Sequence, residues 1–277
     1  MEFFDLSLVD IVLRLLLGTV IGFCIGLTGV GGGVLVLPAL KLILHLDPIT
    51  AVGTTTLYAF LTKITATIQH IKLRTIDWGT SLRFLAGAVP ANIVTSIWVS
   101  RQGANEQFKE ALTNFIVGVI FFSVIMMIVN MITRSRPGVV ARERELAEQI
   151  NETKAVRIEL CILLGAICGG LLGATSIGGG VLIVPILITL FNMPAPRTVG
   201  TAIFIAFILT MITSLIYGSS GVQDRVTALI MATGSVAGVF YGSKLSVRMP
   251  ELFLRVIVVV LVLVAAIMML GRNVAGH

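Results

Sequence analysis

Two glycine-rich motifs are the part of this sequence best suited to bind a ligand. The first, TGVGGG, runs from Thr28 to Gly33, and the second, TSIGGG, runs from Thr175 to Gly180. Each motif interrupts a long apolar segment with residues that favour irregular backbone. Inside a membrane, irregular backbone is tolerated only where protein or a water-filled cavity satisfies its polar groups. We therefore predict that both motifs line a polar site between apolar helices.

The chemistry predicted for this site is anion binding. We expect a half-helix to begin directly after each glycine run, so that its first backbone N–H groups and the positive end of its dipole face the break. Close helix packing is the alternative role for the glycines, but packing does not require three consecutive glycines twice. The predicted substrate contacts are Thr28, Gly29, Gly31, Gly32, Gly33, Thr175, Ser176, Gly178, Gly179 and Gly180.

A Gly-Thr pair follows each motif at the start of a later apolar segment. The pairs are Gly53 with Thr54 and Gly200 with Thr201. Their N–H and hydroxyl groups are predicted to add donors to the same site. The alternative is an ordinary helix start with a small packing residue.

Lys63 is the most unusual side chain in the apolar segments. It falls about three residues, or roughly 4 to 5 Å along a helix, from the midpoint of the segment 50–69. Charge at that depth is costly and usually functional, so Lys63 is predicted to pair with an anionic substrate. The alternative is a lysine that snorkels to the cytoplasmic interface along its aliphatic stem.

The sequence offers little for other kinds of chemistry. No Asp or Glu lies in the middle of an apolar segment, which disfavours an intramembrane aspartyl protease, a carboxylate-lined cation channel and an acidic proton relay. No nucleophile stands with a base, and no metal-ligand cluster appears. We expect no enzyme activity, no metal and no cofactor, and we interpret the three cysteines as packing residues: Cys24, Cys161 and Cys168.

The composition shows which elements must position these residues. Of the 277 residues, 56% are hydrophobic and only 12% are charged, whereas an ordinary soluble domain is about 25% charged. Apolar runs approach the roughly 20 residues that cross a bilayer as helix. The net charge of +6 arises from basic residues in short connections, which indicates membrane topology rather than nucleic-acid binding. The composition therefore predicts an all-α polytopic membrane protein.

The chain repeats itself at an offset of 147 residues. The sequence GLTGVGGGVLVLP begins at Gly26, GATSIGGGVLIVP begins at Gly173, and eight of the thirteen positions are identical. The same offset pairs Asp77 with Asp224 without any gap. A hydrophilic stretch separates the copies, which predicts an N-terminal repeat at 1–133, a linker at 134–156 and a C-terminal repeat at 157–277.

Each repeat contains about five apolar segments. They are predicted at 10–27, 34–46, 50–69, 80–100 and 111–133, and again at 157–174, 181–193, 198–217, 226–247 and 252–270. The second segment is short in both repeats, so the first two either both cross or form a broken, re-entrant hairpin. Both cases give an odd number of crossings, and the two repeats are then inverted in topology. The basic linker predicts a cytoplasmic linker and periplasmic termini.

At these motifs the sequence resembles the sulfite exporter TauE/SafE family, also called the 4-toluene sulfonate uptake permease family. The resemblance rests on GLTGVGGGVLVLPAL, ATSIGGGVLIVPIL, AVGTT and TVGTA, and on the duplicated layout over nearly the whole chain. It implies a secondary transporter for sulfite, sulfonates, sulfoacetate and related small anions. It also implies inverted halves, a homodimer and a bacterial inner membrane, with the substrate held at the two glycine motifs. Lys63 is not part of the general family pattern.

Three functions remain open from the sequence. The favoured one is a secondary transporter that alternates access to a central anion site and carries small sulfur-containing anions. The alternatives are an anion-selective channel and a carrier for non-sulfur organic anions. The expected partners are the small anion and the lipid bilayer, without nucleic acid. Neither the anion nor the direction of transport follows from the residues.

Overall fold

All secondary-structure elements in the described part of the chain are helices. The computed structural model describes residues 7–28, 32–103, 105–134, 154–177, 182–189 and 195–246, together with the single residues 180, 191, 193, 256, 260, 263, 264, 267 and 268. No strand occurs among these residues. The helices with defined bounds are α1 (Leu8–Thr28), α2 (Gly33–Leu42), α3 (Pro48–Lys72), α4 (Trp78–Ser100), α5 (Glu106–Arg134), α7 (Lys154–Thr175), α8 (Ile183–Thr189), α9 (Ala195–Ser219) and α10 (Arg225–Ser246).

These helices coincide with nine of the ten predicted apolar segments. The second segment of each repeat is short, as expected, because α2 has 10 residues and α8 has 7. At 1.5 Å per residue they are roughly 15 Å and 10 Å long, too short to cross a bilayer alone. The tenth predicted segment, 252–270, and most of the linker 134–156 lie outside the described residues.

Aspartate caps begin three of the long helices. Asp47 accepts hydrogen bonds from the backbone N–H of Ile49 and Thr50 at 3.1 and 3.2 Å, and Pro48 follows it at the first helical position. Asp77 caps α4 and Asp224 caps α10 in the same way. An acidic N-cap satisfies helix N–H groups that have no intrahelical partner, so these residues set the starts of α3, α4 and α10.

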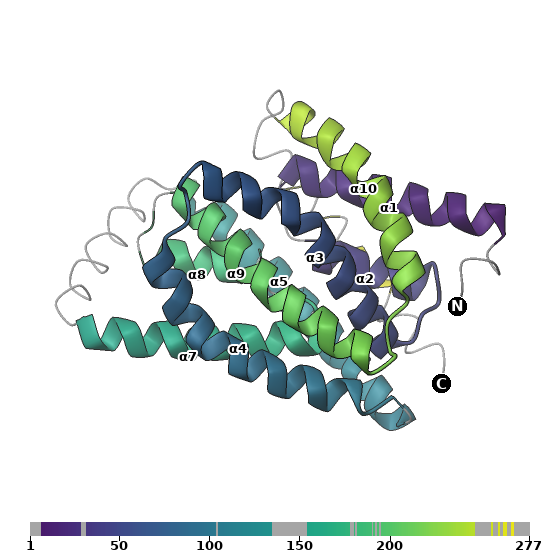
Figure 1. The fold of residues 1–277 in the computed structure, drawn as a ribbon, viewed down its shortest axis with the longest axis horizontal. Helices are drawn as coiled ribbons and strands as arrows, with labels where there is room; N and C mark the ends of the chain where they lie inside the picture. The colour runs from purple at the N-terminus through teal and green to yellow at the C-terminus, as the bar shows by residue number, and fades with distance from the viewer. Residues whose placement is uncertain are drawn as a thin grey trace.

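The long helices pack in pairs that each join one repeat to the other. Helix α1 packs along α10, and α7, its repeat equivalent, packs along α4, the equivalent of α10. Helices α3 and α9 are equivalent to each other and lie side by side between these two pairs (Figure 1). They run antiparallel, because the start of α3 contacts the connection after α9 and the start of α9 contacts the connection after α3. The inverted repeats predicted from the sequence would produce this arrangement.

Small residues bring the outer pairs into close contact. A Cβ added at Gly18 of α1 would lie 2.1 Å from the carbonyl oxygen of Met231 in α10. At the equivalent contact, a Cβ on Gly165 of α7 would lie 2.2 Å from the carbonyl oxygen of Phe84 in α4. Only glycine permits such an approach, which is how membrane helices often associate.

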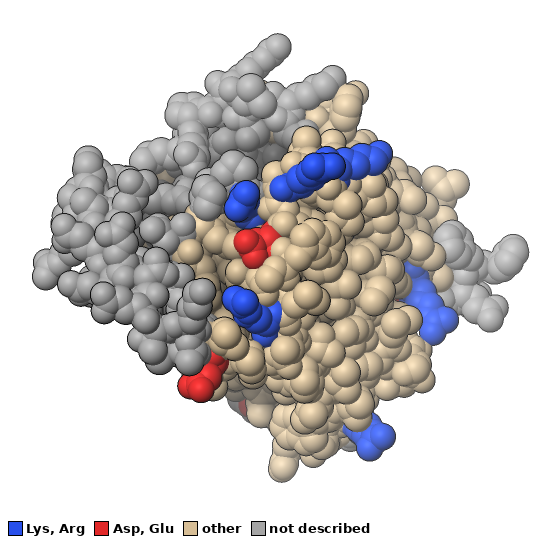
Figure 2. All heavy atoms as spheres, turned by 60° about the vertical axis from the view of Figure 1, so that its left-hand side comes forward, with Lys and Arg blue, Asp and Glu red and all other residues tan. Residues whose placement is uncertain are grey.

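The outer faces of the long helices are apolar. Leu82 and Val94 of α4 and Val236 of α10 are 64%, 67% and 71% exposed. On the face seen in Figure 2, charged side chains gather in the upper part and at the edges, and a broad area of uncharged residues lies between them. Six described helices have the length and apolar composition to cross a membrane: α1, α4, α5, α7, α9 and α10. Such continuous apolar surface suits contact with lipid.

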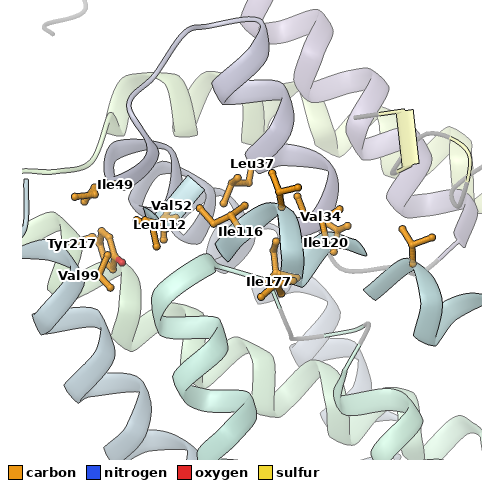
Figure 3. Close-up of a cluster of buried hydrophobic side chains, with 13 residues drawn as sticks. Val34, Leu37, Ile49, Val52, Val99, Leu112, Ile116, Ile120, Ile177 and Tyr217 are labelled. Carbon is orange, nitrogen blue, oxygen red and sulfur yellow. The ribbon is translucent and has the colours of Figure 1, made fainter. Parts of the chain in front are cut away.

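A buried apolar cluster joins the two repeats beside the helix breaks. Val34, which follows the first glycine motif, packs in the same cluster as Ile177 of the second motif (Figure 3). Ile116 and Ile120 of α5 pack in the cluster, and Tyr217 of α9 borders it. The cluster therefore brings apolar side chains from both repeats against Val34 and Ile177.

Candidate anion site at the paired helix breaks

The first break lies between α1 and α2. Helix α1 ends at Thr28, and α2 begins at Gly33 with Gly32 as its N-cap. The carbonyl oxygen of Gly32 accepts from the N–H groups of Leu35 and Val36 at 3.1 and 2.8 Å. The predicted half-helix thus begins directly after the glycine run. Gly29 and Gly31 lie outside the described residues, as does the side chain of Thr28.

The second break differs from this pattern. Helix α7 ends at Thr175, and Ser176 adopts a left-handed backbone with φ of 59°. Gly180 lies in a turn, and α8 begins only at Ile183. Our expectation of a half-helix directly after each glycine run therefore holds for α2 but not for α8, which starts later and is only 7 residues long. Gly178 and Gly179 lie outside the described residues.

The two breaks meet in space. A Cβ added to Gly33 would lie 2.2 Å from the carbonyl oxygen of Ser176, closer than any real Cβ contact. Both residues are buried. Residues 143 positions apart in the chain therefore place their backbones against each other, and the second motif packs against the N-terminal end of α2.

The hydroxyls of the second motif have different partners. The Thr175 hydroxyl donates to the carbonyl oxygen of Leu171 at 2.7 Å and accepts from the N–H of Ile177 at 3.2 Å, so it serves the end of its own helix. The Ser176 side chain is 4% exposed, and its Oγ has no hydrogen-bond partner among the described residues. A buried hydroxyl without a partner costs free energy. Ser176 is therefore the better placed of the two to bind a ligand.

The two Gly-Thr pairs lie at opposite ends of the α3–α9 pair. Thr54 Oγ1 accepts from the backbone N–H of Asp224 at 3.0 Å, and Thr201 Oγ1 accepts from that of Asp77, also at 3.0 Å. Gly53 and Gly200 give the chain room there: an added Cβ would lie 2.4 Å from the carbonyl oxygen of Val222 and 2.6 Å from Thr75 Oγ1, respectively. These contacts join the repeats, and the two pairs do not converge on one another. A role in substrate binding stays a prediction.

Lys63 lies one helical turn from Phe60, the middle residue of α3. Its Nζ donates to the carbonyl oxygen of Ala59 at 3.4 Å. Side chains on a helix point toward its N-terminus, and this contact keeps the ammonium near the middle of α3, away from Lys72 at its end. The role of Lys63 as the counter-charge of an anionic substrate stays a prediction.

Comparison with known proteins matches the chain to probable membrane transporter proteins. A family model described as sulfite exporter TauE/SafE matches residues 14–269. The chain belongs to the TauE/SafE family. It is 31% identical over 253 residues to the probable membrane transporter protein YjnA of Bacillus subtilis, covering 91% of this chain and 97% of the relative. It is 27% identical to the probable membrane transporter proteins YunE of Bacillus subtilis, covering 84% of this chain and 86% of YunE, and MJ0441 of Methanocaldococcus jannaschii, covering 86% of both.

The TauE/SafE match and the six apolar helices identify a multi-pass membrane transporter. No solved structure matches the chain. Among the described residues, no three His, Cys, Asp or Glu side chains come together as a group that could hold a metal ion.

The structure of this TauE/SafE protein also reveals a buried polar network that sequence reasoning missed. Asn92 of α4 donates to the carbonyl oxygen of Gly169 in α7 at 3.1 Å and accepts from Thr213 of α9 at 2.9 Å. Tyr217 of α9 donates to the carbonyl oxygen of Gly173 at 3.0 Å. The network holds the last turns of α7, directly before Ser176. A lone amide in the middle of the apolar segment 80–100 was the available signal.

Proposed function

We propose that this chain is a secondary transporter that moves small sulfur-containing anions, such as sulfite, sulfonates or sulfoacetate-like compounds, across the membrane. The observation that carries the proposal is the contact between Gly33 and the carbonyl oxygen of Ser176. It brings two interrupted helices, one from each repeat, to a common point inside an apolar bundle. Interrupted helices that meet in this way form the substrate sites of many secondary transporters.

The polar groups at this point, together with Lys63 of the neighbouring helix α3, suit an anion. The N-terminal end of α2 supplies backbone N–H groups and a positive dipole end. Ser176 supplies a buried hydroxyl that no described residue uses. Lys63 supplies a cation near the middle of α3. A small anion with several oxygen atoms, such as sulfite or a sulfonate, accepts hydrogen bonds from donors of all three kinds.

Transport by alternating access follows from the relation between the repeats. Antiparallel packing of the equivalent helices α3 and α9 supports inverted repeats, with boundaries at 1–133 and 157–277 and the axis in the membrane plane. Rocking of one repeat against the other would then expose the central site to each side in turn. A monoanion that leaves a cell at about −100 mV inside gains roughly 2.3 kcal/mol, so export proceeds without a coupling ion, whereas concentrative uptake needs one.

We place the transporter in the inner membrane with periplasmic termini and a cytoplasmic linker, as a homodimer. Basic residues in the linker and in the connection after α3 support this orientation. Dimerisation and the inner membrane are carried over from the TauE/SafE resemblance.

Flux measurements on purified protein in liposomes test the proposed function. We expect saturable uptake of radiolabelled sulfite or sulfoacetate that speeds up when the same anion is present on the other side. A screen with thiosulfate, taurine and simple carboxylates identifies the preferred substrate. Unitary currents without counter-substrate stimulation would instead indicate an anion channel. A preference for carboxylates would overturn the sulfur-anion assignment.

A further inference from the structure

The two ends of the α3–α9 pair are built from equivalent residues. At one end, the N–H of Asp224 donates to Thr54 Oγ1, and at the other, the N–H of Asp77 donates to Thr201 Oγ1, both at 3.0 Å. We call these contacts the Asp224 junction and the Asp77 junction. The Asp224 junction joins the first turns of α3 to the connection after α9. The Asp77 junction joins the first turns of α9 to the connection after α3. Both are closed in this structure.

Arg14 strengthens the Asp224 junction. Its side chain comes from α1 and is 8% exposed, and its Nε donates to Thr227 Oγ1 at 2.7 Å. Thr227 Oγ1 in turn donates to Asp224 Oδ2 at 2.6 Å. Asp10 lies 3.8 Å from the guanidinium and half exposed. A buried cation of the first repeat is therefore linked through one hydroxyl to a carboxylate of the second. Charge-assisted hydrogen bonds are among the strongest in proteins.

Gln223 adds a second bond across the same junction. Its Nε2 donates to the carbonyl oxygen of Gly53 at 2.9 Å and to Ser214 Oγ at 3.1 Å. Gly53 belongs to the first repeat and Gln223 to the second, so this bond also joins the repeats. The connection after α9 is thereby tied to the first turns of α3 at two neighbouring residues, Gln223 and Asp224.

The Asp77 junction lacks both of these bonds. The residue equivalent to Arg14 is Cys161, whose Sγ lies 3.8 Å from the carbonyl oxygen of Thr80, the equivalent of Thr227. A thiol is a weak donor and carries no charge here. The residue equivalent to Gln223 is Ile76, which has no polar side chain. The bonds of Arg14 and Gln223, which we call the clamp, are therefore present at one end only. At the other end, Trp78 and Phe204 pack edge to face with ring centroids 5.0 Å apart, a contact without charge or hydrogen bond.

We propose that the two junctions are the gates of the transporter and that Arg14 and Gln223 make the Asp224 gate the harder one to open. The proposal rests on alternating access, in which one junction must open while the other stays closed. If the two gates were identical, the two-fold relation would make the inward- and outward-open states equal in free energy. The clamp removes this equality and favours the state that is open at the Asp77 end.

The predicted topology gives this bias a direction. The start of α1, the start of α3 and the connection after α9 lie on the periplasmic side, so Arg14 holds the periplasmic gate shut. From the closed arrangement of this structure, the Asp77 gate then opens to the cytoplasm more often than the Asp224 gate opens to the periplasm. A carrier with this bias collects its anion from the cytoplasm, which suits export.

Hydrogen–deuterium exchange of the full-length protein in liposomes tests the gates without any substrate. The two junction amides are compared after correction for intrinsic rates. In the parent protein, we expect the amide of Asp77 to exchange on the order of tenfold faster than that of Asp224, since one charge-assisted hydrogen bond typically corresponds to tenfold or more in an equilibrium. Arg14→Cys introduces the residue found at the equivalent position and should reduce the difference to a few-fold. Cys161→Ser is the matched control and should leave the difference intact.

A second variant covers the case in which Arg14→Cys does not fold, as judged by its melting temperature. Gln223→Ile also introduces the equivalent residue and should reduce the difference in part. Equal exchange of the two amides in the parent protein would overturn the proposal, as would an undiminished difference in both folded variants. Exchange does not depend on transport, so failure of the sulfur-anion assignment leaves this result untouched. In flux assays, Arg14→Cys should bring the half-saturation values measured from the two faces closer together.

Discussion

Phe60 and Phe207 stack with their ring centroids 5.4 Å apart and an interplanar angle of 25°. They are the middle residues of α3 and α9 and occupy equivalent positions in the two repeats. If the repeats are inverted, a residue that contacts its own equivalent lies close to the axis between them. The stacked rings therefore mark the centre of the α3–α9 pair. Lys63 lies one helical turn from Phe60.

Removal of either ring should weaken the packing of α3 against α9. We expect Phe60→Ala and Phe207→Ala each to lower the melting temperature. The double variant should lose less than the sum, with a coupling of about 0.5 to 1.5 kcal/mol for an aromatic pair. Thermal unfolding in detergent measures all three. Additive losses would mean that the two rings do not stabilise one another.

Gly33 should tolerate no side chain. Gly33→Ala places a methyl group against backbone, the carbonyl oxygen of Ser176, and overpacking of this kind typically costs about 1 to 3 kcal/mol. We expect it to separate the two breaks and abolish flux. Gly118→Ala in α5 is the matched control, because nothing lies within 4 Å of a Cβ added there. The control should retain much more flux, and equal activity of the two variants would contradict the contact.

Lys63→Met removes the charge and keeps most of the stem. If the ammonium pairs with the anion, binding should weaken by about 1.5 to 3 kcal/mol, or roughly ten- to a hundredfold in Kd. Lys63→Arg keeps the charge but misplaces it, so we expect an intermediate loss. Equilibrium binding to purified protein measures both variants. Parent-like binding by Lys63→Met would leave the anion to the helix end and Ser176.

Asn92 should contribute to stability through its two partners. Asn92→Leu leaves the carbonyl oxygen of Gly169 and the Thr213 hydroxyl without their hydrogen bonds. Leaving such buried groups unpaired costs about 1 to 3 kcal/mol. Adding Thr213→Val should recover part of that loss, because the hydroxyl is then absent as well. Denaturation of the single and double variants measures this. No loss in the single variant would show that the network is not stabilising.

Cysteine labelling tests the orientation. Cys24, Cys161 and Cys168 are buried, which keeps background labelling low. In intact cells an impermeant reagent should label Asn273→Cys, which we place in the periplasm, and should not label Ser135→Cys. After permeabilisation both should react. Labelling of position 135 in intact cells contradicts the cytoplasmic linker.

The amino-acid sequence alone determined the helical class, the repeat and the short second segments. Bilayer thickness sets the length of apolar segments, and the offset that pairs Asp77 with Asp224 is visible in one dimension. The TauE/SafE family followed from the glycine motifs. These features are local along the chain, so residue type and spacing suffice to identify them.

Only the tertiary structure decided which residues meet. Gly33 touches Ser176 because two helices from different repeats end at the same point, and no spacing along the chain encodes that approach. Thr54 and Thr201 look like site residues in the sequence, yet their hydroxyls accept bonds from the opposite repeat at the two ends of the bundle. The clamp from Arg14 to Asp224 depends on partners 213 and 210 residues away. Such long-range contacts form only when whole helices pack. How they pack is set jointly by the side chains of all the helices involved.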